Sequence, residues 1–274
     1  MKKIHEIRMK NSYFYISLIA LIVIMGITWF FESGFAEVMF FMDYDAPDLI
    51  GQSKEEVKRM LLDQILVWEG YIDSAMRYIV YIFPVFAVIP TIPFLLEQNS
   101  YFVFGAARFD NYNKNLGKAI LTYTLQGGVC ITLGLLIYFT IGNLVMVPAL
   151  DDISGFTSVL PKGFYAEHSY LFFVFMSVTI YFFIGLVFAG MACGVALFTT
   201  KEYYVLIIPI LVYIGLGYLG SGFGIHLFQI PVAVISYNTK YTTFECFIPL
   251  IPPAIIDIIL ISVGIARRKK EIVC

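Results

Sequence analysis

Long apolar runs alternate with short polar segments along the whole chain. The runs cover residues 13–31, 76–96, 118–141, 170–198, 203–223 and 247–266. A hydrocarbon core about 30 Å thick is crossed by roughly 20 helical residues, because each residue advances a helix by about 1.5 Å. Lipid offers the backbone no hydrogen-bond partners, so runs of this length predict helices rather than the alternating strands of a barrel. The pattern predicts an all-α integral membrane protein with six transmembrane helices in a single domain, residues 1–274.

Composition agrees with this pattern. Of the 274 residues, 59% are hydrophobic and only 14% are charged, which leaves too little polar surface to cover a soluble globule. The first run is too long for the apolar core of a signal peptide, and no small-residue cleavage site follows Phe31, so we expect it to be retained as a span. Four scattered cysteines without CxxC spacing indicate neither a disulfide framework nor a metal site.

The basic residues are unevenly distributed between the polar segments. With a cytoplasmic N-terminus, twelve of the eighteen fall on the inner side: Lys2, Lys3, Arg8, Lys10, Arg108, Lys114, Lys118, Lys201, Arg267, Arg268, Lys269 and Lys270. Positive charge near the ends of spans favours the cytoplasm, so both termini are predicted to be cytoplasmic. The first outer segment is strongly acidic by contrast. Nothing in the charge pattern indicates a nucleic-acid partner.

Two outer segments are expected to carry structure of their own. Residues 32–75 are long enough to fold locally, and the run from Ser53 to Glu56 resembles a capping box that opens an amphipathic helix ending at Gly70. This helix either rests on lipid or neighbouring spans, or contacts a substrate or receptor. Residues 224–246 are apolar but short and interrupted by proline, which predicts a re-entrant or interfacial segment before the sixth span.

The sequence lacks the motifs of an enzyme. Gly215 to Gly220 spell G-x-G-x-x-G, but no strand, following helix or acidic residue supports a dinucleotide site, so we interpret these glycines as helix-packing positions. Gly190 and Gly194 have the same use at G-x-x-x-G spacing. A Walker lysine, an HExxH pair and a nucleophile elbow are absent from the sequence. We expect no catalytic residue, no metal and no cofactor in this chain.

Two features inside the spans break the apolar pattern. Asp257 is an acidic residue deep in the sixth span, where an unpaired carboxylate costs on the order of 3 kcal/mol. It either lines a translocation path or is a buried carboxyl that is protonated or hydrogen-bonded to a neighbouring helix. Prolines in the second and sixth spans should kink or break those helices. These breaks either act as hinges or only shape the packing of the helices. The prolines are Pro84, Pro90, Pro93, Pro249, Pro252 and Pro253.

The polar stretch between the second and third spans is longer than a simple reversal requires. It contains Tyr101, Phe102, Phe104, Phe109 and Tyr112 beside Arg108, and in a helix Phe102 and Phe109 share one face while Phe104 and Arg108 share another. Exposed aromatic and arginine side chains suit a docking site for a cytoplasmic partner. A helix lying on the inner lipid surface is the alternative.

As a whole, this arrangement resembles the permeases of ATP-binding-cassette exporters, in the branch with drug, polysaccharide and bacteriocin efflux or immunity permeases. The shared features are six spans, a basic amphipathic lead-in (MKKIHEIRMKNSYF), a polar helix after the second span, a four-residue link before the fifth span and a re-entrant segment. Glu97, Gly105, Arg108 and Lys118 resemble the family's acidic start, small residue, central arginine and closing lysine. The outer segment after the first span is longer than the family's usual link.

The resemblance implies a function. Residues 100–110 would be the coupling helix that contacts a separate ATPase, and residues 4–9 the elbow helix. The implied coupling residues are Glu97, Tyr101, Phe102, Phe104, Gly105, Arg108, Phe109 and Lys118, and Asp257, Tyr213 and Tyr218 are candidates for the translocation path.

In this reading ATP and Mg²⁺ bind the partner ATPase, and the permease pairs with a second copy or a relative in the plasma membrane to export a peptide or other amphipathic compound. The alternative is a membrane sensor or immunity protein that binds an extracellular ligand without transport. A secondary transporter would usually show an internal repeat and paired intramembrane charges.

Overall fold

The computed structural model describes residues 8, 11–46, 53–105, 111–147, 160–161, 163–238, 241–242 and 244–273. Within them the chain is all-α, with six helices long and apolar enough to cross a membrane: Ser12–Glu32, Trp68–Phe102, Tyr112–Val145, Ser169–Ala196, Glu202–Phe223 and Glu245–Lys270. Each contains most or all of one predicted apolar run. The prediction of an all-α chain with six candidate spans is confirmed, and the protein is a multi-pass membrane protein by this criterion.

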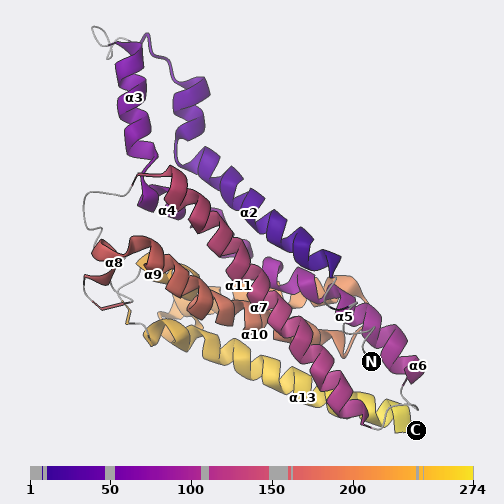
Figure 1. Cartoon of the computed structure of the whole chain (residues 1–274). Coiled ribbons are helices and arrows are strands. Elements are labelled where there is room, and N and C mark those ends of the chain that lie inside the picture. The colour runs from indigo at the N-terminus through magenta and orange to yellow at the C-terminus, as the bar shows by residue number, and fades with distance from the viewer. Residues whose placement is uncertain are drawn as a thin grey trace.

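Several spans consist of more than one helical element (Figure 1). The first span is α2 (Ser12–Glu32), the third α7 (Tyr112–Val145) and the fifth α11 (Glu202–Phe223). The second span joins α4 (Trp68–Val88), η3 (Ile89–Thr91), α5 (Ile92–Glu97) and η4 (Gln98–Phe102), and α6 (Val103–Gly105) continues it. The fourth joins α9 (Ser169–Met176), η6 (Ser177–Tyr181) and α10 (Phe182–Ala196), and the sixth joins η9 (Glu245–Leu250) to α13 (Ile251–Val273).

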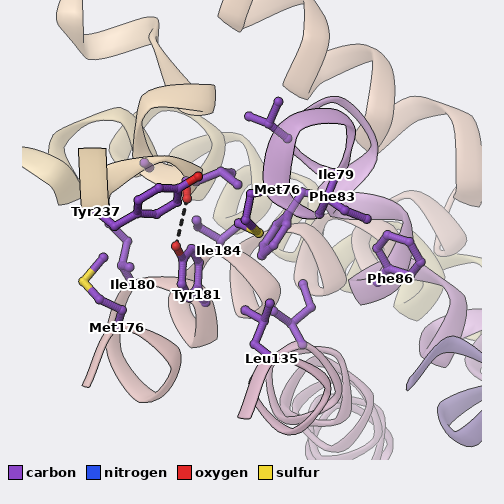
Figure 2. Close-up of a cluster of buried hydrophobic side chains, with 14 of the residues drawn as sticks. Met76, Ile79, Phe83, Phe86, Leu135, Met176, Ile180, Tyr181, Ile184 and Tyr237 are labelled. Atoms are coloured by element: carbon purple, nitrogen blue, oxygen red, sulfur yellow. Dashed lines mark hydrogen bonds between the residues drawn. The ribbon is translucent and has the colours of Figure 1, made fainter. Parts of the chain in front are cut away.

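The second span lies at the centre of the bundle, together with α7 and α10. In the most apolar stretch of this span, 67% of the residues are buried inside the molecule, against 22% in the first and the sixth spans. Figure 2 shows Met76, Ile79 and Phe83 of α4 facing Leu135, Tyr181 and Ile184 across the buried core. In lipid such helices associate through close packing rather than through the hydrophobic effect. The core therefore consists of interlocking side chains between these three spans.

Glycines allow α10 to approach α13 closely. A Cβ on Gly190 would lie 2.3 Å from Oδ2 of Asp257, and one on Gly194 would lie 2.9 Å from Cβ of Leu260. The predicted packing role of the G-x-x-x-G pair is confirmed. In the G-x-G-x-x-G string, a Cβ on Gly220 would meet the backbone of Gln229 at 2.6 Å, whereas Gly215 faces open space.

Two prolines of α4 and η3 leave backbone carbonyls without their helical donors, and other spans supply donors. Proline has no N–H, so Pro84 frees the carbonyl of Val80 and Pro90 frees that of Phe86. The Tyr213 hydroxyl of α11 donates to the Val80 oxygen, and the Ser17 hydroxyl of α2 donates to the Phe86 oxygen at 2.7 Å. The helix continues through Pro84 and changes to a 3₁₀ turn around Pro90. The prolines thus create hydrogen bonds between spans.

The acidic outer segment differs from its predicted form. It holds η1 (Glu37–Phe41) and α3 (Lys54–Ile65), but the Ser53 hydroxyl donates to Glu55 at 3.1 Å instead of capping the helix. The helix also ends before Gly70, which lies in the first turn of α4. Backbone bonds from Trp68 N to Val147 O and from Val147 N to Leu66 O, both 2.9 Å, separate the two helices. This tertiary contact overrides the local helical pattern.

The segment before the sixth span folds back into the bundle. It forms η7 (His226–Phe228), α12 (Ile230–Val234) and η8 (Ser236–Asn238). Ile230, Ala233 and Val234 are fully buried, and the Tyr181 hydroxyl donates to the Val234 carbonyl at 3.0 Å. Tyr237 is buried against the same core (Figure 2).

The described ends of the chain gather at one end of the bundle. Figure 1 shows α6, the start of α7 and the end of α13 there, with η1, α3 and α8 (Phe164–Glu167) at the opposite end. We refer to these as the α6 end and the α3 end. The even number of spans produces this arrangement.

Candidate functional site

The polar stretch after the second span is the first candidate. Its described part, up to Gly105, is a helical continuation of the second span through α5, η4 and α6 instead of a separate short helix. Arg108 and Phe109 lie outside the described residues, as does the predicted elbow segment apart from Arg8. The third span starts beside it, where Oδ1 of Asn111 caps α7 by accepting from the Lys114 N–H at 3.0 Å. The two spans thus run close together at the α6 end.

The aromatic side chains of this stretch divide into a buried and an exposed set. Phe102 is only 1% exposed, with its ring edge-on to Tyr112 at 5.9 Å between centroids. Tyr101 is partly buried against the same cluster. The expectation that Phe102 is exposed is therefore wrong, because this ring fills the space between η4 and α7. Phe104 is 84% exposed and Val103 54%. We name these two residues the exposed pair.

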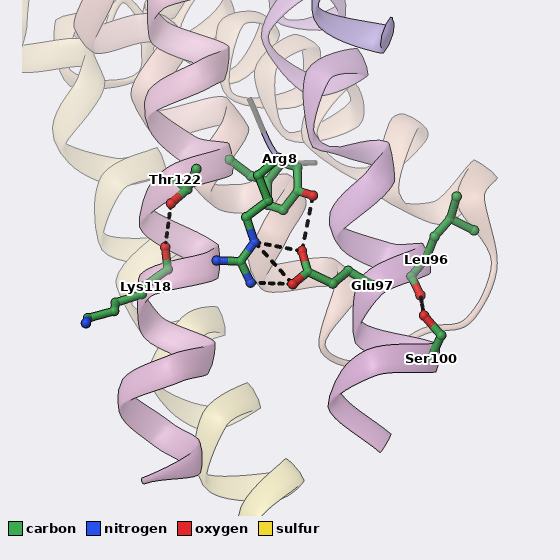
Figure 3. A network of polar contacts seen from close by, with 7 residues as sticks. Arg8, Leu96, Glu97, Ser100, Lys118 and Thr122 are labelled. Carbon is green, nitrogen blue, oxygen red and sulfur yellow. Dashed lines mark hydrogen bonds and ion pairs between the residues drawn. The ribbon is translucent and has the colours of Figure 1, made fainter. Parts of the chain in front are cut away.

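Glu97 faces the interior of the molecule. Nε of Arg8 donates to both carboxylate oxygens, at 3.1 and 3.0 Å, and Nη2 donates to Oε1 as well (Figure 3). The Tyr123 hydroxyl of α7 donates to Oε2 at 3.1 Å. The Arg8 and Glu97 side chains are only 11% and 12% exposed. The carboxylate thus has two partners from two other segments of the chain.

Further hydrogen bonds extend this ion pair toward the first span. The Arg8 carbonyl accepts from Nε2 of Gln126 at 2.7 Å. Nδ2 of Asn11 donates to the Pro90 carbonyl at 2.7 Å and to Oε1 of Gln126 at 2.8 Å, while its Oδ1 caps α2 by accepting from the Tyr13 N–H at 3.1 Å. We call this set the Arg8–Glu97 network: Arg8, Asn11, Pro90, Glu97, Tyr123 and Gln126.

The arginine of this ion pair keeps its charge. Burial alone lowers the pKa of Arg8, but the hydrogen bond and the charge of Glu97 raise it above the ordinary arginine value. Arg8 therefore remains protonated at any physiological pH, and the contact with Glu97 stays a charge-assisted one.

Sequence reasoning identified Glu97 but missed its partners. Gln126 is a lone amide in an apolar span and Asn11 directly precedes one, and both are signals of buried hydrogen bonding. Neither signal names a partner. Lys118, the last predicted coupling residue, is exposed on α7 and extends away from the network (Figure 3). For Gly105 only the backbone is described.

The three candidates for a translocation path lie in different surroundings. Tyr213 is 1% exposed and bonded to α4, whereas Tyr218 on the same helix is 75% exposed. Asp257 is partly buried on α13 beside Gly190, and its Oδ1 is buried without a hydrogen-bond partner among the described residues. These contacts do not place the three side chains in one site.

Comparisons with known proteins add no family: no family model, no curated protein and no solved structure matches the chain. Among the residues that the structure describes, acidic, cysteine and histidine side chains form no group that could hold a metal ion. The α6 end, with its exposed pair and its buried ion pair, is therefore the candidate functional site.

Proposed function

We propose that this chain is the membrane-spanning permease subunit of an ATP-binding-cassette transporter, which exports a peptide or other amphipathic compound. The observation that carries the proposal is Phe104, an 84% exposed aromatic side chain. It lies two residues after Phe102, which is buried against α7 and fixes this end of the second span. Large exposed aromatics on a rigid support are typical anchors of protein interfaces. A soluble ATPase would provide the pocket that covers it.

The proposal assigns the nucleotide chemistry to the partner. ATP and Mg²⁺ would bind the ATPase, and its closure would displace the α6 end and rock two permease copies between inward-open and outward-open states. In this scheme the α6 end and both termini face the cytoplasm, and α3 faces outward from the plasma membrane. The excess of basic residues near the α6 end supports that orientation.

The test is a pair of matched substitutions. Phe104→Asp should weaken association with the proposed partner ATPase by about 30-fold or more, the effect of losing an interface anchor worth about 2 kcal/mol. Phe244→Asp is the control, because Phe244 is 87% exposed at the α3 end. Association is measured by co-purification in detergent and by titration in nanodiscs. Equal binding by wild type and both variants would overturn the proposal.

A further inference from the structure

Arg8 and Glu97 form the most buried ion pair that the structure describes. Arg8 lies four residues before the first span, and Glu97 lies near the end of the second span. The other such pair, Arg77 with Glu32 at 2.8 Å, has an arginine side chain that is 65% exposed, against 11% for Arg8. A surface pair of that kind contributes about 0–1 kcal/mol. A buried pair with further hydrogen bonds has a different consequence, because breaking one partner leaves an unpaired charge inside the protein.

The network connects three spans through one short segment. Arg8 contacts Glu97 of α5 through its side chain and Gln126 of α7 through its carbonyl. Three residues later, Asn11 bonds to the Pro90 carbonyl and to Gln126, and also caps α2. The links extend from Glu97, about two helical turns before α6, to Gln126, about four turns into α7. The start of α2 is therefore fixed to the second and third spans at the same level.

We infer that Arg8 and Glu97 are positioning residues that make the start of the first span part of one rigid unit with the inner ends of the second and third spans. A displacement of the α6 end then moves α2 as well. This last consequence rests on the proposed function, whereas the rigid connection itself does not. Glu97 acts through Arg8 and does not contact the ATPase.

Glu97 then has a different role from that of an ATPase-contacting residue. A residue on the ATPase-facing surface would be exposed, as Phe104 is, and its loss would weaken association. Glu97 is 88% covered and has both oxygens occupied by Arg8 and Tyr123. Its loss should leave association intact and disconnect the first span.

The first measurement needs no ATPase. Nitroxide labels at Tyr15→Cys, 57% exposed on α2, and Val103→Cys, 54% exposed on α6, report the distance between the two elements by pulsed electron paramagnetic resonance. Cys274 is replaced by serine, and the three remaining cysteines are buried. We expect one narrow distance population in the parent protein and an additional longer population after Glu97→Gln. Identical distributions would overturn the inference.

Two further variants keep this result interpretable. Glu202→Gln is the control, since Glu202 is an exposed glutamate at the start of α11 and its loss should leave the distance unchanged. Arg8→Lys retains the charge but loses the forked geometry, so its longer population should be smaller than that of Glu97→Gln. If Glu97→Gln does not fold, Arg8→Lys against the parent decides, and an unchanged distance again overturns the inference.

The second measurement separates this inference from the proposed function. In a complex with the ATPase, Glu97→Gln should lower transport by about 5-fold or more at unchanged association and ATP hydrolysis, within the usual range of coupling between two sites. Weakened association would mean that Glu97 contacts the partner and would overturn the positioning role. A longer distance population in a protein that binds no ATPase would support the rigid connection while the proposed function fails.

Discussion

Two carboxylates near or within the membrane spans have opposite environments. Glu97 receives hydrogen bonds from Arg8 and Tyr123, whereas Oδ1 of Asp257 is buried with no partner in the described part of the chain. Asp257 instead lies against Gly190, where only hydrogen stands between the helix backbone and the carboxylate. An acidic residue in an apolar span therefore does not define its own role. The neighbouring segments decide whether the carboxylate links several spans by hydrogen bonds, as Glu97 does, or only fits beside a small residue, as Asp257 does.

The largest effect should come from removing the ionic partner of Glu97. Arg8→Met leaves Glu97 buried with only the Tyr123 hydroxyl, and we expect it to lower the free energy of unfolding by about 3–5 kcal/mol. Arg77→Met removes the solvent-exposed ion pair with Glu32 and should cost about 0–1 kcal/mol. Denaturant unfolding in detergent measures both. Equal losses in the two variants would show that burial does not distinguish these ion pairs.

The unpaired carboxylate can be tested through its glycine neighbour. A Cβ at position 190 would lie 2.3 Å from Oδ2 of Asp257, so Gly190→Ala should destabilise the α10–α13 contact by about 1–3 kcal/mol. Adding Asp257→Ala should recover part of that loss, because the clash disappears. Gly26→Ala is the matched control, since nothing lies within 4 Å of its added methyl group. A double-mutant cycle without coupling would contradict this contact.

A smaller effect is expected at the Val80 carbonyl, which Pro84 leaves without its helical donor and which accepts from one side-chain hydroxyl among the described residues. Tyr213→Phe removes the hydroxyl that bonds to the Val80 oxygen and should cost about 1–2 kcal/mol, the usual loss when a buried acceptor is left unsatisfied. Tyr218→Phe on the same helix should be close to neutral, because Tyr218 is 75% exposed. Thermal unfolding followed by the fluorescence of a reporter dye compares them. A neutral Tyr213→Phe would mean that the hydroxyl is dispensable.

The smallest effect should come from neutralising Asp257. Asp257→Asn removes an ionisable group that has no ionic partner among the described residues while keeping the size of the side chain, so stability should change by less than about 1 kcal/mol or rise slightly. The same change at Glu97 should be much more harmful, since Arg8 would lose its counter-charge. Parallel unfolding curves for Asp257→Asn and Glu97→Gln make the comparison direct. Similar losses at both sites would reveal an ionic partner of Asp257.

The positions of the spans followed from hydropathy, and most of the spans are longer than the predicted apolar runs. The second run was predicted to end at Leu96, but the helix continues because Phe102 and its neighbours pack on α7. The helix predicted to reach Gly70 ends at Ile65 because Leu66 and Val147 exchange backbone hydrogen bonds. Glu97 could be selected from the sequence as an unusual residue, but its partners could not, because Arg8 and Tyr123 are 89 and 26 residues away.

The membrane location and the helices could be read from the sequence, because apolar runs of this length are stable only in lipid and a backbone in lipid must satisfy its own hydrogen bonds by forming helices. Which polar groups contact one another depends on how the spans pack together. A proline in the sequence shows that a carbonyl is freed, yet the Tyr213 and Ser17 hydroxyls reach those carbonyls from other spans. Hydropathy is a property of each segment, whereas a hydrogen bond between spans depends on the distance and direction that packing creates.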